Sequence, residues 1–480
     1  MKMKIFYAAL LVISASMLFA DGFAFQPGQI DVNGPVDNII VQDINNDSRP
    51  ELIIQNKRQL LVYKPSEAAG YALANTVILP DNIFIYDISG AIFGVTPEGL
   101  VKSGFGDLGK FTPELSAPTI FRGKPNDKPI YRKFIYPELG AFIPCENRFS
   151  LARLIDNQYK IAANIPYLMR TSVNYNEQSV FEPVTTRTSL PRLIIADING
   201  DGNNDVLALT TSDIRCFIND GRWVSSSVLQ AKAADSNEIN IIAPVIEDIN
   251  NDKKADIVTA DSSEGVITVY LAPEFGKPAQ IIRTGNWIVS DSLIDLNNDG
   301  LRDLVLVQMK KLGVLGGLQA FLAHSVDWEM VVYLARPGSG FPKSPDYVRE
   351  FNVPFTLNIS GSGNISGSKA INYTFQTPYL WSFSGDFNKD GLKDLLISTA
   401  DGKLQIYPGV AGRVFEREPA QEILLASIKD GFKLTGMPQG EPIVNDLNND
   451  GVSDIIVQLT NPATNATRLE IFIPGNWLKK

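Results

Sequence analysis

The chain has 480 residues, a formal net charge of −10, two cysteines and one histidine. A single histidine, His324, argues against a Ser-His-Asp triad, a His-ligated zinc site and a histidine general base. We expect it to be structural. Two cysteines are too few for a disulfide scaffold, and an acidic chain with no basic stripe is not expected to bind nucleic acid.

Residues 1–24 are predicted to be a secretory signal peptide. Lys2 belongs to a short basic start, and Ile5–Phe19 forms an apolar core too short for a confident membrane span. Small residues favour cleavage after Ala24, with Ala20 as the alternative cleavage site and an uncleaved anchor as the alternative fate. The mature chain, residues 25–480, should therefore be a single domain with no membrane span, secreted or periplasmic.

A nine-residue acidic phrase then recurs six times. It has Asp at positions 1 and 5, Asn at position 3, and Asp or Glu at position 9. The copies begin at Asp43, Asp197, Asp248, Asp295, Asp386 and Asp446. Position 6 is glycine in four copies, but Ser48 in the first and Lys253 in the third. Four fixed polar positions match by chance about once in 10⁵ starts, so the phrase is a repeat.

Oxygen atoms at positions 1, 3 and 5 of a tight loop converge on one point, and the carbonyl at position 7 and the carboxylate at position 9 can complete the shell. Ca²⁺ takes about 6–8 such oxygen ligands, and glycine at position 6 permits the sharp turn. Two carboxylates about 4 Å apart repel by roughly 4 kcal/mol at an effective dielectric constant near 20. A bound divalent cation would remove this repulsion.

We therefore predict calcium at the four glycine-bearing copies, and at up to six. The predicted ligands are Asp43, Asn45, Asp47 and Glu51; Asp197, Asn199, Asp201, Asn203 and Asp205; Asp248, Asn250, Asp252 and Asp256; Asp295, Asn297, Asp299, Leu301 and Asp303; Asp386, Asn388, Asp390, Leu392 and Asp394; and Asp446, Asn448, Asp450, Val452 and Asp454. The six phrases hold three acidic residues each, or 18 of the 53 in the chain, so most of the net acidity is attributed to metal sites.

Two alternatives to a calcium loop are considered. One is a metal-free Asx-rich turn, which has more weight for the copies at Asp43 and Asp248. The other is an EF-hand, which needs a bidentate Glu at position 12 and helices on both sides. Position 12 is apolar in the four glycine-bearing copies, as at Leu306, and the flanks have β-type patterns such as Leu193–Ala196 and Val206–Leu209. Each loop is thus expected to join two strands.

The phrase and the strand after it resemble the FG-GAP/VCBS-type repeat, which is also found in the integrin alpha-subunit propeller. The resemblance extends to a third strand and a Gly-aromatic turn, as in Ile214–Trp223, Leu404–Gly409 and Leu469–Trp477. It covers residues 30–75 and 190–480 well and 76–189 poorly. It implies an all-β chain: a β-propeller of four-stranded blades, with calcium loops between the first two strands of most blades.

The spacing of the phrases sets the expected number of blades. The step from Asp43 to Asp197 is 154 residues, about three times the step of 51 from Asp197 to Asp248. We infer two degenerate blades without metal loops in residues 76–189. Six blades with loops and two without make eight, with seven as the close alternative that the family resemblance favours.

Three further features are predicted. Residues 336–377 are rich in Gly, Ser, Pro and Asn, and should form an inserted hairpin or loop region with either a recognition role or no role. Residues 25–32 could supply the fourth strand of the last blade and close the ring. Cys145 and Cys216 fall in neighbouring blades, where they could pair or remain buried thiols.

The function expected is that of a calcium-binding propeller acting as a binding, adhesion or scaffold module, with an unidentified protein or glycan partner. No catalytic constellation can be assembled, so an enzyme is not the first choice. The alternative is a calcium-dependent carbohydrate-binding protein or a polysaccharide lyase on a propeller, because the 15 Tyr and 5 Trp residues could stack on sugars. Trp223, Trp287 and Trp477 occupy expected blade-turn positions, which favours packing. A scaffold subunit of an envelope assembly is a third possibility.

Overall fold

The structure is a computed structural model. It describes residues 25–66, 70–104, 109–123, 125, 127–167, 170–174, 185–209, 213–221, 223, 225–230, 241–312, 320, 322–337, 340–354, 356–361, 371–376, 380–399, 401–435 and 441–474. The predicted signal peptide, with its cleavage sites at Ala20 and Ala24, lies outside the described residues, as does Trp477.

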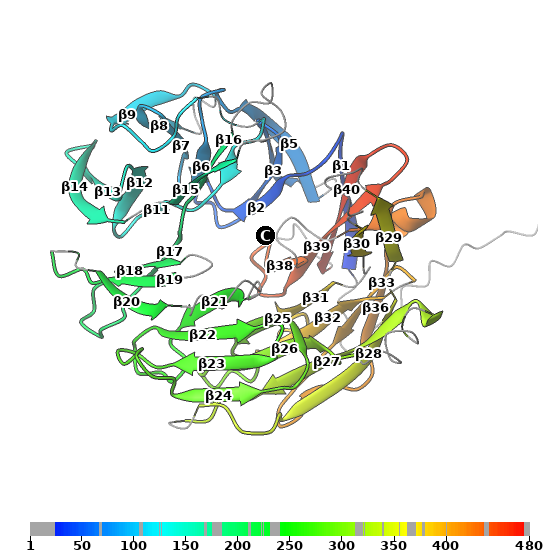
Figure 1. The fold of residues 1–480 in the computed structure, drawn as a ribbon. Helices are drawn as coiled ribbons and strands as arrows, with labels where there is room; N and C mark the ends of the chain where they lie inside the picture. Colours follow the sequence, from blue (N-terminus) through cyan, green and yellow to red (C-terminus); the bar gives the residue numbers. More distant parts are fainter. Residues whose placement is uncertain are drawn as a thin grey trace, which may run out of the picture.

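Eight β-sheets, here called blades 1 to 8, are arranged around a common centre, as Figure 1 shows. The fold is therefore an eight-bladed β-propeller, and the seven-bladed alternative is wrong. Blade 1 holds β2 (Asn38–Gln42), β3 (Glu51–Asn56), β4 (Gln59–Ser66) and β5 (Gly70–Ile78). Its strands pair antiparallel in chain order, from the inner strand to the outer strand.

Blades 2 and 3 occupy the segment without acidic phrases. Blade 2 holds β6 (Ile85–Ile88), β7 (Ile92–Thr96), β8 (Gly99–Ser103), β9 (Thr112–Ser116) and β10 (Ile130–Tyr131), which pairs parallel to β6. Blade 3 holds β11 (Ile135–Tyr136), β12 (Gly140–Cys145), β13 (Arg148–Ile155) and β14 (Gln158–Pro166).

Blades 4 to 7 repeat one order of strands. Blade 4 holds β17 (Arg192–Ala196), β18 (Asp205–Leu209), β19 (Asp213–Phe217) and β20 (Ser225–Gln230), and blade 5 holds β21 (Ile241–Glu247), β22 (Asp256–Asp261), β23 (Val266–Tyr270) and β24 (Gln280–Arg283). Blade 6 holds β25 (Trp287–Ile294), β26 (Asp303–Met309), β27 (Ser325–Tyr333) and β28 (Tyr347–Pro354), and blade 7 holds β31 (Trp381–Gly385), β32 (Asp394–Ser398), β33 (Lys403–Tyr407) and β36 (Gln421–Leu424). Beside blade 7, β34 (Gly409–Val410) pairs with β35 (Val414–Phe415).

Blade 8 closes the ring with strands from both ends of the chain. It holds β38 (Ile443–Asn445), β39 (Asp454–Asn461), β40 (Ala466–Pro474) and β1 (Phe25–Val32), with β37 (Lys433–Leu434) at the edge of β39 after the 3-10 helix Ala426–Asp430. Strand β1 runs antiparallel to β40, from the pair Phe25–Pro474 to the pair Val32–Thr467. This confirms the prediction that residues 25–32 supply the closing strand.

The hydrophobic core is divided into eight clusters, and each cluster is shared by two neighbouring blades. The cluster of blades 1 and 8, for example, joins Leu52 and Ile54 to Ile456 and Ile471. A strand in which apolar and polar residues alternate buries only one of its two faces. A strand in a propeller blade lies between two neighbouring blades, so both of its faces are buried. This explains continuous apolar runs such as Leu304–Val307, which are fully buried.

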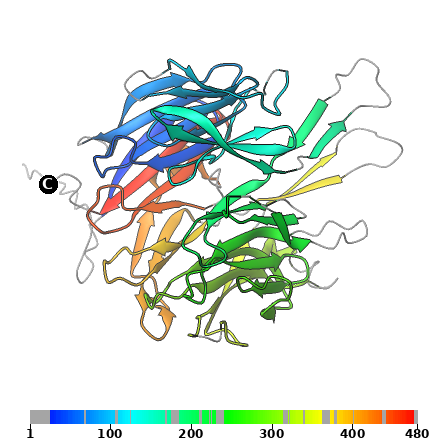
Figure 2. The same cartoon turned by 90° about the vertical axis from the view of Figure 1, so that its left-hand side faces the viewer.

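Besides the short β34–β35 pair, two hairpins of the described chain stand outside the blades. Strands β15 (Arg170–Asn174) and β16 (Thr185–Ser189) precede blade 4, and β29 (Thr356–Gly361) and β30 (Ile371–Gln376) precede blade 7. Figure 2 shows that both project from the same side of the ring. The second hairpin lies in the predicted insertion 336–377, of which residues 338–339, 355, 362–370 and 377 lie outside the described part.

Three remaining expectations concern single residues. Cys145 and Cys216 are buried and unpaired thiols. Trp223 is buried, but Trp287 is the first residue of the inner strand β25 and not part of a blade turn, so that expectation is wrong for Trp287. No helix among the described residues is long and apolar enough to cross a membrane.

Candidate metal centres

The six acidic phrases form loops that connect the first strand of a blade to the second. They occur in blades 1, 4, 5, 6, 7 and 8, each between the end of an inner strand and the start of its neighbour. Because all inner strands run in the same direction, the six loops lie on one face of the ring. The hairpins described above precede inner strands, so they lie on the opposite face.

All six loops share one backbone conformation. Positions 4 and 6 have positive φ in every copy, which is the left-handed region that favours glycine. Gly300 has a φ of 85° at position 6, and Ser48 and Lys253 adopt 65° and 69° at the same position without glycine. The two copies without glycine therefore fold as the other four do, against a conformational preference.

The loop that starts at Asp295 shows the hydrogen bonds of the set. Asp295 accepts the backbone N–H groups of Asp299 (3.1 Å) and Gly300 (2.9 Å) through different carboxylate oxygens. Asn297 accepts the N–H of Asp299 at 3.1 Å and donates to its carboxylate at 3.0 Å. Asp299 in turn accepts the N–H of Leu301 at 2.8 Å. The side chains at positions 1, 3 and 5 are thus positioned by their hydrogen bonds to the backbone of their own loop.

The carboxylate at position 9 has a different role from those at positions 1 and 5. Asp303 is fully buried, and it accepts the N–H of Leu296 inside the loop (3.0 Å) and the N–H of Ala335 after the third strand (2.8 Å). Asp205, Asp256 and Asp394 make the same pair of bonds in their blades. Position 9 therefore ties the loop to the third strand of its own blade.

Burial raises the pKa of these position-9 carboxyls. It raises those of Asp256, Asp303 and Asp394 to about 6, although the backbone hydrogen bonds lower them and the acids at positions 1 and 5 raise them further. The pKa of Asp454 reaches about 8, again chiefly through burial. One of its oxygens has no hydrogen-bond partner within the described residues. By strand register, the blade 8 residue that corresponds to Gly409, the donor to Asp394 in blade 7, is Pro474, which has no N–H to donate.

The loops carry negative charge that no described ion pair neutralises. The ion pairs of the described chain leave out every Asp at positions 1 and 5 of the six loops. The donor set, which is carboxylate and amide oxygen with backbone carbonyl, is of the kind that Ca²⁺ takes. In the arrangement described, however, no three His, Cys, Asp or Glu side chains converge as a metal-binding group. The chemistry fits calcium, and the acids would have to close around it.

Neighbouring loops are linked to each other. In three junctions the backbone N–H at position 8 donates to a carbonyl of the preceding loop. The bonds run from Ala255 to Asp197 (2.8 Å), from Lys393 to Leu296 (3.1 Å) and from Ser453 to Asp386 (2.9 Å). Between blades 5 and 6, Arg302 at position 8 instead forms an ion pair with Glu247 at 2.7 Å.

Blade 2 has no acidic loop but contains one buried acid that the sequence analysis missed. Asp87, 2% exposed, accepts the N–H groups of Phe134 and Ile135 in the next blade, each at 2.8 Å. Burial raises its pKa, and these hydrogen bonds oppose the shift. The sequence feature that could have identified Asp87 is its position in the inner strand of blade 2, a few residues before the turn at Gly90.

The structure is a β-propeller whose repeats carry an acidic loop between their first two strands. Residues 197–259 and 248–306 match the family model described as an FG-GAP-like repeat, so the chain carries FG-GAP-like repeats on an eight-bladed propeller. This confirms the family resemblance. A comparison with curated proteins found no match.

Several solved structures of low identity align with most of the chain. One is a lectin of Agrocybe aegerita specific for non-reducing terminal N-acetylglucosamine (12% identity, TM-score 0.40, 83% of this chain and 90% of the lectin). A second is BBS1N in complex with ARL6DN (9%, 0.40, 94% and 98%), and a third is the V. cholerae biofilm matrix protein Bap1 (10%, 0.30, 92% and 78%). At these identities and TM-scores, none of them indicates the function of this chain.

Proposed function

We propose that this protein is a calcium-stabilised binding module that acts outside the cytoplasm. The observation that carries the proposal is the set of six equivalent loops, in which acids at positions 1 and 5 face a tight turn and form no ion pair among the described residues. The predicted signal sequence supports export. Residues at positions 1, 3, 5 and 9, with the carbonyl at position 7, would hold the ion.

In this proposal calcium is structural. The ion neutralises the carboxylates of each loop, and the loop fixes the inner strand relative to the second strand. Because position 9 also binds the backbone after the third strand, as Asp303 binds Ala335, one ion would stabilise three strands of a blade. A rigid ring of this kind presents loops and hairpins on the opposite face, where a partner could bind.

The first test compares the mature protein with calcium and after chelation. Thermal unfolding and calorimetric titration should show between four and six ions per chain and a lower melting temperature without them. As a matched pair, Asp299→Ala should lose one ion, whereas Asp327→Ala, on the exposed surface of β27, should lose none. An equally heat-stable protein after chelation would refute the structural role.

Glycan binding is the second candidate, and the tryptophans bear on it directly. Trp223 and Trp328 are buried, and Trp381 packs against Trp328 with ring centroids 5.4 Å apart. Trp287, 36% exposed at the start of β25, remains available for stacking on a sugar. A polysaccharide panel, read for retention and for newly formed unsaturated ends, separates a lectin from a lyase. Retention that survives Trp287→Ala would remove the observation behind this candidate.

A further inference from the structure

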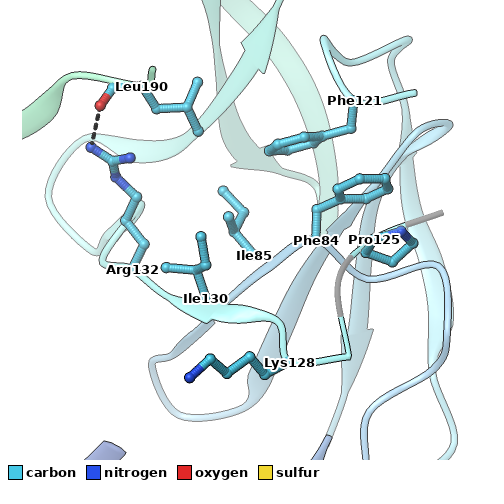
Figure 3. A pocket seen from close by; sticks show the side chains of 8 residues that line it. All are labelled: Phe84, Ile85, Phe121, Pro125, Lys128, Ile130, Arg132 and Leu190. Carbon is cyan, nitrogen blue, oxygen red and sulfur yellow. Dashed lines mark hydrogen bonds between the residues drawn. The ribbon is translucent and has the colours of Figure 1, made fainter. Parts of the chain in front are cut away.

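A cavity of about 130 Å³ lies beside the inner strand of blade 2. Figure 3 shows its walls, which come from three separate parts of the chain. Phe84 and Ile85 stand at the start of β6, Ile130 and Arg132 belong to the segment that follows β9, and Leu190 directly precedes blade 4. The starts of the inner strands mark the face opposite the acidic loops, so the cavity opens among the elements of that face.

One end of the cavity is apolar and preformed. Phe84 stacks on Phe121, with ring centroids 4.6 Å apart and an angle of 13° between the planes. Ile85 is buried, whereas Ile130 is 61% exposed at the rim. A dry apolar cavity of about 150 Å³ is known to accept a benzene molecule. The space here therefore suits an apolar group of about the size of one ring.

The other end of the cavity holds a cation with no described counter-ion. Arg132 donates from one terminal nitrogen to the carbonyls of Leu190, at 3.0 Å, and Pro191. Its remaining nitrogens have no hydrogen bond within the described residues, and no described carboxylate pairs with it. Lys128, the other cation of the lining, is already paired with Asp37 at 2.8 Å.

The electrostatic surroundings increase the demand for an anion. Burial lowers the pKa of Arg132 and the charge of Arg192 lowers it further, whereas Tyr136 and Tyr167 oppose the shift. Residues 122–133 contain five basic residues and one acid, in a chain whose net charge is −10. A ligand that brings negative charge would relieve the cost of a partly buried guanidinium that has no described counter-ion.

We propose that this cavity binds a carboxylate joined to an apolar group of ring size. The free N–H groups of Arg132 donate to the carboxylate, and the apolar group lies between Ile85, Ile130 and Phe84. The ligand is either a small free acid or the C-terminal residue of a peptide, because both present the same chemistry. This inference rests on the proposed role as a binding module and names one ligand for it.

Calorimetric titration of the calcium-loaded full chain tests the inference with defined probes. The probes are 3-phenylpropanoate, its uncharged amide, and a pentapeptide of four alanines and a final phenylalanine with either a free or an amidated C-terminus. The charged forms should bind at least about tenfold more tightly than the amides, since a charge-assisted hydrogen bond is lost. Binding by the small acid alone identifies a free acid as the source, and tighter binding by the peptide identifies a chain terminus; both support the proposal.

Two variants and one control variant locate the site. Arg132→Gln should weaken binding of the charged probe at least about tenfold, while Arg153→Gln should not, because Arg153 also donates to a carbonyl (Leu139, 3.1 Å) but lies outside the cavity. Ile130→Glu places a carboxylate at an exposed rim position where folding should be unaffected, and it should repel the same probe. The assignment is overturned if acid and amide bind equally, if none of the probes binds, or if Ile130→Glu binds as the wild type does. A normal chelation result would leave the calcium proposal standing in each of those cases.

Discussion

Replacing Asp291 by asparagine should stabilise the protein above about pH 4, with the full effect above about pH 6. Asp291 lies on the inner strand β25, two residues from Leu293, so both side chains point to the side on which blade 6 packs against blade 5. Both carboxylate oxygens are buried, and neither has a hydrogen-bond partner among the described residues. Burial, the chief cause, raises the pKa from 3.8 to about 6.

The direction of the pKa shift determines how stability depends on pH. A carboxyl whose folded pKa exceeds its unfolded pKa favours the folded state while it is protonated, so stability falls as the pH rises from about 4 to about 6 and stays lower above that. A shift from 3.8 to about 6 corresponds to about 3 kcal/mol at pH 7.5, at 1.36 kcal/mol per unit. Asparagine resembles the neutral acid, so Asp291→Asn should recover most of the free energy of unfolding that the ionised carboxylate costs.

The assay is the difference in free energy of unfolding between the variant and the wild type, at pH 4 and pH 7.5, by denaturant titration in calcium. The expected difference is near zero at pH 4 and up to about 3 kcal/mol in favour of the variant at pH 7.5. Asp327→Asn on the exposed surface is the control, and it should change stability by less than about 0.5 kcal/mol at both pH values. A variant no more stable than the wild type at pH 7.5 would show that the Asp291 carboxylate is solvated or paired in solution.

Three further predictions concern backbone and closure. Lys253→Gly should raise stability by about 1 kcal/mol, because it removes a side chain from a left-handed position that glycine occupies in four equivalent loops; no gain on thermal unfolding would contradict this. Gly300→Ala should cost about 1 kcal/mol in the same assay, and a Cβ there would meet nothing within 4 Å, so a much larger loss would point to an unrecognised contact. Arg468→Ala should weaken the closing strand by about 1–2 kcal/mol, since Arg468 pairs with Asp31 at 2.6 Å and lies 4.3 Å from the ring of Phe432. The rate of limited proteolysis at residues 25–32 should then increase, and an unchanged rate would argue against a role of Arg468 in holding the closing strand.

The repeats could be predicted because each one is specified locally. Asp, Asn and Asp at alternate positions bond to the backbone of the same nine residues, as Asp295 does with Gly300, so the signal is present wherever the loop forms. The closing role of residues 25–32 followed from a blade that lacked one strand. In each case the physical requirement, a folded loop or a paired edge, has a short sequence signature.

The remaining features depend on contacts between distant segments, which no local pattern specifies. The strands Gly99–Ser103 and Arg148–Ile155 in blades 2 and 3 have no acidic phrase to mark them. Asp87 meets its partners across a blade junction, and the cavity joins Phe84 to Arg132 and Leu190. The contacts of the loops with one another were likewise not foreseen, because position 8 has no fixed residue type.

The hydrogen bonds between loops have a thermodynamic consequence. Five loops, in blades 4 to 8, form a continuous series. At three junctions the N–H at position 8 donates to a carbonyl of the loop before it, and at the fourth Arg302 pairs with Glu247, the last residue of the strand that leads into the preceding loop. If calcium orders one of these loops as proposed, the neighbouring loop loses less conformational entropy when it binds its own ion. The calcium affinities of the five loops should therefore be coupled, and their titration should be cooperative. The loop of blade 1 has Pro50 at position 8, which has no N–H to donate. That loop should fill independently of the others, as a separate phase in the binding curve.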